Sequence, residues 1–399
     1  MNVLFMTIAY PKVGEHNIYS DLMQEFERNG HQVYIACSNE KRNGQQTVVN
    51  EEEEKDVLRI RIGNLTGNVN LIEKCLTTVS LESTFIKAIK TYLQGVKFDL
   101  IIYSTPPITF ARAVEYFKKR DNAKTYLLLK DIFPQNAVDI GMIKGKSLLH
   151  RYFRSKEKKL YSLSDYIGCM SQANVDFVLK HNPDIPADRV EICPNSILPA
   201  KLDRPDKRSI RTNYKIPDDC TTFIYGGNLG KPQGIDFVVE CLKNNMNLND
   251  RFFIICGKGA EYHKLEAFYK EQQPSNMLLI NGLPKKEYDE LVTGCDVGLI
   301  FLDHRFTIPN FPSRLLSYME YAMPVVACTD ANTDLGEVIC DGKFGWWCKS
   351  NDSGSFKDII DSICSSRDEL STYGDNARKY LVKYYTVRTS YEIIMKHFN

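Results

Sequence analysis

Runs of consecutive apolar residues alternate with amphipathic stretches along most of the chain. The first apolar run spans 2–9, a loop follows at 10–16, and an amphipathic stretch ending at Arg28 leads to a second apolar run at 32–37. Continuous apolar runs are typical of strands buried on both faces, and strands that alternate with helices predict a parallel sheet. Ligands of such sheets bind beyond the carboxyl ends of the strands, so the loops after the apolar runs are candidate sites.

The same alternation continues through two halves that are separated by a lapse in the pattern. Further strands are predicted at 57–62, 99–104, 125–129, 165–170, 190–193, 222–225, 252–256, 277–280, 297–301, 325–328 and 346–348, and helices at 70–94 and 386–398. Between the halves, the stretch 197–219 contains three prolines and many charges, which predicts a linker. We therefore expect an α/β protein of two domains, 1–198 and 199–385, with the last helix (386–399) packed back on the first domain.

One stretch of the second half, TFIYGGNLGKPQG at 222–234, combines several signals of a ligand site. A short apolar run ends in Gly226 and Gly227, a polar loop follows, and Gly234 opens an amphipathic helix. Glycines let the backbone approach a ligand closely, and the free amides of a helix N-terminus attract anions. The stretch is therefore a candidate phosphate site, although an ordinary connection between a strand and a helix has the same pattern.

Composition narrows the classes of protein. A chain of 399 residues is too long for one average core, and its 43% hydrophobic and 25% charged residues are those of an ordinary globular protein. The 51 basic residues nearly balance the 50 acidic ones, so bulk charge does not indicate nucleic acid binding. Because no run of about 18 apolar residues exists and Met1 leads straight into an apolar strand, we expect neither a membrane span nor a signal peptide. The acidic run 51–55 is expected on a surface loop.

The twelve cysteines are scattered and form no CxxC pair. Several lie inside apolar runs, where a free thiol behaves as a small hydrophobe: Cys37, Cys169, Cys256 and Cys328. We expect the cysteines to be reduced, in a cytoplasmic protein without a zinc site.

Two loops of the first half carry polar side chains at the expected ligand edge. They contain Gly14, Glu15 and His16 after the first strand, and Lys130, Asp131 and Asn136 after the strand at 125–129. Side chains that follow directly on buried parallel strands are positioned to contact a substrate. For His16 alone, a solvent-exposed loop is an equally good interpretation.

The stretch 144–159 is basic and has apolar residues at helical spacing. It contains a single acidic residue, Glu157. Its basic residues are Lys144, Lys146, Arg151, Arg154, Lys156, Lys158 and Lys159. A basic amphipathic helix can lie on an anionic membrane surface. A solvated helix that packs on its own domain has the same pattern, and both interpretations stay open.

An ordered series of motifs resembles glycosyltransferase family 4, and the resemblance covers nearly the whole chain. The motifs are GHQV (30–33), KDIFPQNAVDIGMI (130–143), CPNS (193–196), GGNLGKPQG (226–234), ICGKG (255–259), NGLPKKEY (281–288), CDVGLI (295–300) and PSRLLSYMEYAMPVVA (312–327). The resemblance implies the GT-B fold, in which two Rossmann-like domains face each other across a cleft. It also implies transfer from a nucleotide sugar with retention of anomeric configuration, without a metal cofactor and without an agreed protein nucleophile.

The resemblance assigns roles to particular residues. Donor contacts are expected from Gly14, Gly227, Asn228, Lys231, Lys258, Gly259, Leu283, Ser313, Arg314 and Ser317, and acceptor contacts from Glu15, His16, Lys130 and Asn136. Asp131, Lys231 and Arg314 are the expected catalytic residues. The two cations would neutralise the negative charge that grows on the departing nucleoside diphosphate, whereas Asp131 would face the sugar and the acceptor.

Two departures from the family's pattern concern the donor site. The family carries two glutamates eight positions apart before its PV segment, and this chain has Pro309 and Ser317 at those positions. The second glutamate holds the nucleotide ribose, so here Ser317, or Glu320 one turn further on, would have to do so. The arginine and lysine of the family's diphosphate loop are replaced by Asn228 and Gln233.

The sequence thus predicts a hexosyl- or N-acetylhexosaminyl-transferase of capsule, O-antigen or exopolysaccharide assembly. The donor would be a UDP-sugar, and the acceptor a saccharide on a lipid pyrophosphate at the inner face of the cell membrane. Membrane contacts are expected from Arg151, Arg154, Lys158 and Lys159, and no nucleic acid partner is expected.

Two other functions fit parts of the pattern. The missing glutamate pair would suit a non-catalytic partner subunit of a transferase. A sugar-nucleotide 2-epimerase shares the fold but needs carboxylates as acid and base, for which Asp131 is the single candidate, and the motif order argues against it. A nicotinamide oxidoreductase fits poorly, because Gly227–Gly230 lacks the full GxGxxG motif.

Overall fold

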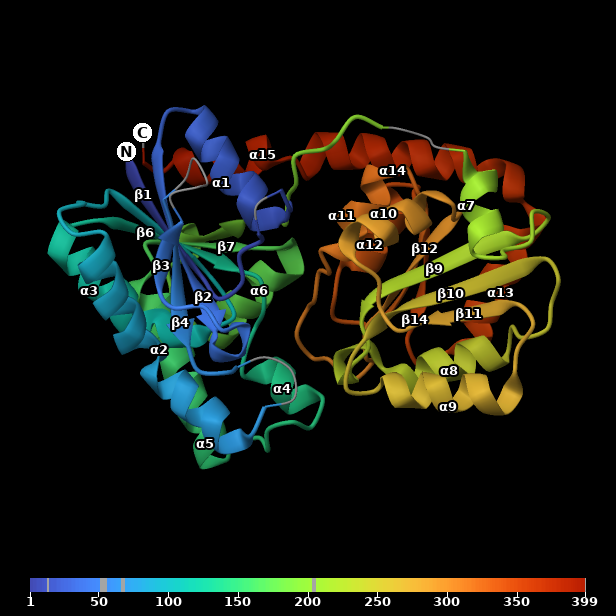
Figure 1. The fold of residues 1–399 in the computed structure, drawn as a ribbon, viewed down its shortest axis with the longest axis horizontal. Coiled ribbons are helices and arrows are strands. Elements are labelled where there is room, and N and C mark those ends of the chain that lie inside the picture. Colours follow the sequence, from blue (N-terminus) through green and yellow to red (C-terminus); the bar gives the residue numbers. More distant parts are fainter. Residues whose placement is uncertain (13, 51–55, 66–68, 203–205, 399) are drawn as a thin grey trace. The chain divides into compact units, whose positions relative to one another are not determined.

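The computed structural model describes residues 1–12, 14–50, 56–65, 69–202 and 206–398. The acidic run 51–55, expected on a surface loop, lies outside these residues. The chain divides into two compact units, which we call unit 1 (residues 1–198 and 385–399) and unit 2 (residues 199–384). Each unit is a parallel sheet covered by helices (Figure 1).

The described part of unit 1 contains an eight-stranded sheet with the order β3-β4-β2-β1-β5-β6-β7-β8. Its strands are β1 Asn2–Thr7, β2 Gln32–Glu40, β3 Val48–Asn50, β4 Asp56–Ile62, β5 Leu100–Ser104, β6 Lys124–Leu129, β7 Tyr166–Cys169 and β8 Val190–Ile192. All neighbours are parallel except β3 and β4, which are antiparallel. The sequence pattern missed β3, because a three-residue edge strand carries too few side chains to show a period.

Helices of unit 1 cover both faces of this sheet. They are α1 Ile18–Arg28, α2 Leu71–Tyr92, α3 Ala111–Asp121, α4 Gln135–Asp139, α5 Leu148–Leu163, α6 Gln172–His181 and α15 Val387–Met395. The chain returns to unit 1 through α15, whose Tyr391 ring packs edge-on against Phe26 with ring centroids 4.9 Å apart. The Tyr391 hydroxyl lies 2.9 Å from His31 Nε2, and Val387 and Ile394 are buried in the same core.

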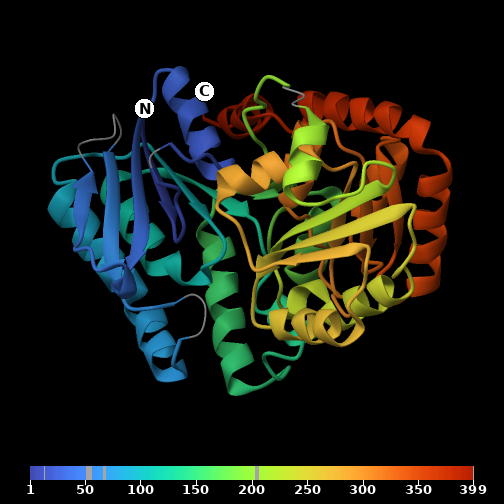
Figure 2. The ribbon, with the colours of Figure 1, turned by 45° about the vertical axis from the view of Figure 1, so that its right-hand side comes forward.

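The described part of unit 2 contains a six-stranded, all-parallel sheet with the order β11-β10-β9-β12-β13-β14. Its strands are β9 Thr221–Asn228, β10 Arg251–Lys258, β11 Met277–Ile280, β12 Val297–Phe301, β13 Val325–Thr329 and β14 Gly345–Lys349. Its helices are α7 Lys207–Asn213, α8 Ile235–Lys243, α9 Tyr262–Gln272, α10 Lys285–Thr293, α11 Arg314–Glu320, α12 Leu335–Asp341, α13 Ser353–Ser365 and α14 Leu370–Tyr384. Helices α8 and α9 lie side by side in both views (Figures 1 and 2).

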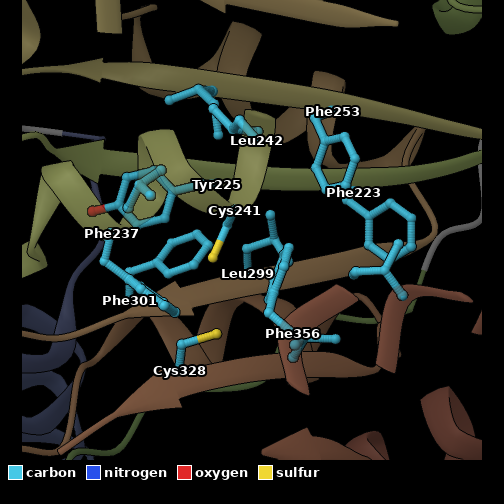
Figure 3. Packing of buried hydrophobic residues seen from close by; sticks show 14 of the residues in the cluster. Phe223, Tyr225, Phe237, Cys241, Leu242, Phe253, Leu299, Phe301, Cys328 and Phe356 are labelled. Carbon is cyan, nitrogen blue, oxygen red and sulfur yellow. The ribbon is translucent and has the colours of Figure 1, made fainter. Parts of the chain in front are cut away.

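The core of unit 2 is aromatic and contains several of its cysteines (Figure 3). Phe223 of β9 stacks on Phe253 of β10 with ring centroids 5.1 Å apart, and Phe356 of α13 packs against Phe253 from the helix layer. Cys241 and Cys328 belong to the same buried cluster, where a free thiol behaves as a small hydrophobe.

Two boundaries differ from the sequence predictions for physical reasons. The expected linker contains a helix, α7. The side chain of Asp206 caps this helix by accepting a hydrogen bond from the backbone amide of Arg208. An ion pair between Arg211 and Asp296, at 2.6 Å, attaches α7 to the rest of unit 2. Strand β9 does not end before its glycine pair, because Gly226 and Gly227 pair in register with the end of β10. Gly226 and Gly227, which were expected to follow the strand, therefore form part of its carboxyl end.

Candidate functional site

A pocket of about 620 Å³ lies in unit 2 at the carboxyl ends of β9 and β10. Its lining residues are Gly226, Gly227, Asn228, Cys256, Gly257, Lys258, Gly282, Leu283, Lys285, Tyr288, Asp289, Ser313, Arg314 and Ser317. Most of the expected donor contacts thus lie around one pocket. The others are Lys231 and Gly259, which lie on the adjoining loops, and Gly14, which belongs to unit 1.

Arg314 opens α11 and points at the end of β9. Its guanidinium lies over the ring of Tyr225, 4.2 Å from the ring centroid. Gly227 has φ +132°, and a Cβ atom there would come within 1.9 Å of Arg314 Nη2. A side chain at 227 would therefore displace the guanidinium. Glycine is favoured at this position for two reasons, the space that Arg314 occupies and the positive φ angle of the backbone. No carboxylate pairs with Arg314 among the residues that the structure describes.

Lys258 supplies a second cation to the same pocket. Its methylene stem lies along Gly282, where a Cβ atom would come within 2.8 Å of Lys258 Cε. The side chain is exposed at its end, and in the described ranges no acidic group pairs with it. Two unpaired cations beside glycine backbone make a pocket that favours a multiply charged anion.

The loop between β9 and α8 is held closed by an amide pair. Asn228 Nδ2 donates to Gln233 Oε1 at 3.1 Å, and the same oxygen accepts a hydrogen bond from the Gly230 amide at 3.2 Å. These two side chains stand where the resemblance has arginine and lysine, so their role here is to fix the loop. The exposed Lys231 remains the cation of this loop.

The structure separates the two candidates for the missing glutamate. Ser317 lines the pocket, whereas Glu320 does not. Glu320 lies at the last position of α11, and its Oε1 accepts a hydrogen bond from the Ala200 amide at 2.8 Å. Glu320 therefore ties the start of unit 2 to α11. Pro309 precedes α11 and does not line the pocket either.

Three pocket residues on α10 were missed by the sequence reasoning, namely Lys285, Tyr288 and Asp289. They fall on the NGLPKKEYDE segment, whose charges have the pattern of a solvated helix face. Tyr288 packs against Gly226, where a Cβ atom would come within 2.0 Å of its hydroxyl oxygen. That hydroxyl is buried, and burial raises its pKa, so it remains protonated.

In unit 1, Asp131 is the acidic residue at the end of β6. Asn136 Nδ2 lies 2.7 Å from each of its carboxylate oxygens. Burial raises the pKa of Asp131 to about 6. The hydrogen bonds from the Ile132 amide and from Asn136 lower this pKa, but their effect is smaller than that of burial. Asn136, expected as an acceptor contact, is thus engaged with Asp131.

The other acceptor candidates of unit 1 also have partners. Lys130 Nζ donates to the carbonyl oxygens of Cys193 and Pro194, both at 3.3 Å, and burial lowers its pKa. His16 Nδ1 lies 3.2 Å from Asp21 Oδ1, but two thirds of the His16 side chain is exposed. Glu15 accepts a hydrogen bond from the Lys12 amide at 3.3 Å. Both Glu15 and His16 are exposed in this loop.

The chain is similar to known glycosyltransferases. Residues 206–380 match the family described as Glycosyl transferases group 1. The chain is 25% identical over 314 residues to WbjE of Pseudomonas aeruginosa, which is named a probable glycosyltransferase. This match covers 77% of the chain and 76% of WbjE. It is 22% identical over 251 residues to WcaI of Escherichia coli K12, whose name refers to colanic acid biosynthesis; this match covers 61% of the chain and 60% of WcaI.

Among solved structures, Alr3699/HepE of Anabaena in complex with UDP-glucose is similar with a TM-score of 0.72 and 14% identity. The match covers 100% of this chain and 99% of HepE. The protein is a glycosyltransferase with the GT-B fold. The matched family segment lies within unit 2, which contains the pocket with Arg314 and Lys258.

The basic helix of this glycosyltransferase begins later than the sequence indicated. α5 starts at Leu148, with Ser147 as its N-cap, so Lys144 and Lys146 precede the helix. Arg154 pairs with Glu157 at 2.5 Å, and Lys159 pairs with Glu115 at 2.7 Å. These two expected membrane contacts are therefore engaged within unit 1. Arg151 and Lys158 are exposed, and the described residues offer them no ion-pair partner.

No helix in the described ranges of the glycosyltransferase is both long enough and apolar enough to cross a membrane.

Proposed function

We propose that this glycosyltransferase moves a sugar from a UDP-sugar to a saccharide on a lipid pyrophosphate, with retention of anomeric configuration, in surface polysaccharide assembly. The nucleotide-sugar donor is supported chiefly by one observation, the pocket beside the glycines of β9 and β10. Among the described residues, no acidic group pairs with the Arg314 and Lys258 side chains in this pocket. A diphosphate would supply the missing negative charge. The names of WcaI and of the HepE complex support the pathway and the UDP-sugar, respectively.

The chemistry assigned to these residues follows from their charges. Arg314, Lys258 and Lys231 would bind the diphosphate and stabilise the charge that accumulates on it as the glycosidic bond breaks. Asp131 would accept a hydrogen bond from a sugar hydroxyl and stabilise positive charge on the sugar ring. Asp131 belongs to unit 1, whereas the three cations belong to unit 2.

Titration calorimetry of the protein with UDP, GDP and ADP tests the donor site. We expect UDP to bind and the other two to bind more weakly. Lys231→Ala should raise the Kd for UDP about threefold to tenfold, because an exposed cation contributes modestly to anion binding. Lys243→Ala, which removes a cation from the far end of α8, is the matched control and should leave the Kd unchanged. Absence of binding to all three nucleotides would remove the donor site and favour the non-catalytic subunit.

We also propose that the protein contacts the inner membrane face through the start of α5. Large apolar side chains are exposed there, with Leu148 at 84% and Met142 at 61%, and Leu149 and Tyr152 are exposed beside them. The exposed cations Lys144, Lys146, Arg151 and Lys158 accompany them. Apolar side chains that enter the interface and cations that bind anionic lipid headgroups act together in such surfaces.

Vesicle flotation tests this contact. Replacing Lys144, Lys146 and Arg151 with glutamine should weaken binding to vesicles with 30% phosphatidylglycerol by more than tenfold, since each cation near an anionic surface contributes about 1 kcal/mol. The matched control replaces Lys343, Lys349 and Lys379 of unit 2, which are also exposed, and changes the net charge equally. Equal binding of both triple variants would contradict a specific membrane face.

A further inference from the structure

One carboxylate faces a pocket that otherwise favours anions. Asp289 of α10 is the single acid among the described residues that line the pocket, and its neighbours there include Lys258 and Arg314. A carboxylate next to a bound diphosphate would repel it. A carboxylate at this position is therefore better suited to a neutral, hydrogen-bond-donating part of the same ligand.

The carboxylate of Asp289 has acceptor capacity to spare. Its Oδ2 accepts a hydrogen bond from Lys285 Nζ at 2.7 Å, one helical turn earlier on α10. Its Oδ1 has no hydrogen bond within the part of the chain that the structure describes, and 28% of the side chain is exposed. One oxygen is thus oriented by lysine, and the other is accessible to a ligand.

Packing fixes the position of this carboxylate. The preceding residue, Tyr288, lies against Gly226 and so anchors α10 to the end of β9. Asp289 of α10 and Ser317 of α11 both line the pocket, so the two side chains border the same ligand space.

We propose that Asp289 binds the ribose 2′- and 3′-hydroxyls of the donor nucleotide. This assignment rests on the proposed nucleotide-sugar donor. A vicinal diol donates two hydrogen bonds to a carboxylate, which is how acidic residues recognise ribose in other nucleotide sites. The carboxylate comes from α10, whereas Ser317 of α11 contributes only a hydroxyl. In this proposal Arg314 and Lys258 bind the diphosphate, and the Asp289 carboxylate, oriented by Lys285, binds the sugar of the nucleoside.

Calorimetry with UDP and 2′,3′-dideoxy-UDP tests the assignment. The unaltered protein should bind UDP about tenfold more tightly than the dideoxy form, the size expected for hydrogen bonds to a charged group. Asp289→Asn should weaken UDP binding about tenfold and leave the dideoxy form unaffected, so that the preference disappears. Glu290→Gln, the neighbouring exposed acid on α10, is the matched control and should keep the preference.

A rescue variant separates a ribose contact from a structural effect. Ser317→Glu combined with Asp289→Asn returns a carboxylate to the pocket from α11 and should restore the preference for UDP over the dideoxy form. An undiminished preference in Asp289→Asn would overturn the assignment while leaving the donor site intact. A loss of affinity that is equal for UDP and its dideoxy form would also overturn it and indicate a contact with the base. Absence of UDP binding by the unaltered protein would instead overturn the proposed donor, and this assignment with it.

Discussion

Replacing Arg314 with alanine should raise the Kd for UDP by about 10- to 100-fold, the loss expected when a hydrogen bond to a charged group is removed. The rate of UDP release from the donor sugar should fall further, by about 10²- to 10³-fold in total, because the guanidinium acts most strongly on the charge that forms in the transition state. The reason lies in its surroundings. Arg314 stacks on Tyr225 and, in the described residues, has no carboxylate to neutralise it. Calorimetry and a coupled assay for UDP measure the two effects.

Conservative and matched variants separate charge from position. Arg314→Lys keeps the charge but loses the planar group that stacks on Tyr225, so we expect about a tenfold loss in rate. Gly227→Ala keeps the arginine residue but displaces its guanidinium, because the added methyl group would come within 1.9 Å of Nη2, and it should resemble Arg314→Ala in UDP affinity. Arg208→Ala, an exposed arginine of α7, is the control. Full activity of Arg314→Ala would contradict the assignment of this side chain to the diphosphate.

Much of the fold follows from the apolar runs. The strands Met277–Ile280 and Val297–Phe301 were predicted to the residue, because continuous apolar runs bounded by polar loops have few alternatives. The predicted end of β9 was wrong, because glycines have no side chain and so add nothing to a pattern of apolar and polar positions. Strand pairing with β10, which is a tertiary contact, extends β9 through Gly226 and Gly227.

The pocket shows a similar division between local and tertiary signals. Glycine spacing and the ordered motifs indicated Gly227, Lys258 and Arg314. The sequence could not indicate Asp289, since its spacing from Lys285 is that of any solvated helical ion pair. The packing of Tyr288 on Gly226, a tertiary contact, helps to hold that face of α10 at the pocket.

Charge patterns also cannot tell a free cation from an engaged one. Arg154 and Lys159 matched the expected membrane helix as well as Arg151 did. However, the partners of Lys159 and Arg154 include Glu115 of α3 and Asn182 after α6, which are distant in the sequence. The tertiary structure therefore moves the proposed membrane contact to the start of α5.

The rate of sugar transfer should fall as the pH falls through about 6, because Asp131 acts in its ionised form and its pKa is raised to about 6 by burial. Asp131→Asn should lower the rate by about 10²-fold or more and remove this acidic limb of the pH profile. UDP affinity, which depends on unit 2, should be unchanged. Initial rates of UDP release between pH 5 and about 8 measure the profile.

Asn136→Ala tests the same assignment through the position of the limb. The amide of Asn136 donates to both carboxylate oxygens and lowers the pKa of Asp131, so its removal should raise that pKa further. The acidic limb should then move to higher pH, and the rate at pH 6 should fall more than the rate at pH 8. Gln135→Ala, a change at the adjacent position of α4, is the control and should leave the limb in place. A limb that stays at the same pH in Asn136→Ala would contradict the expectation that the Asn136 hydrogen bonds set the pKa of the group that controls the profile.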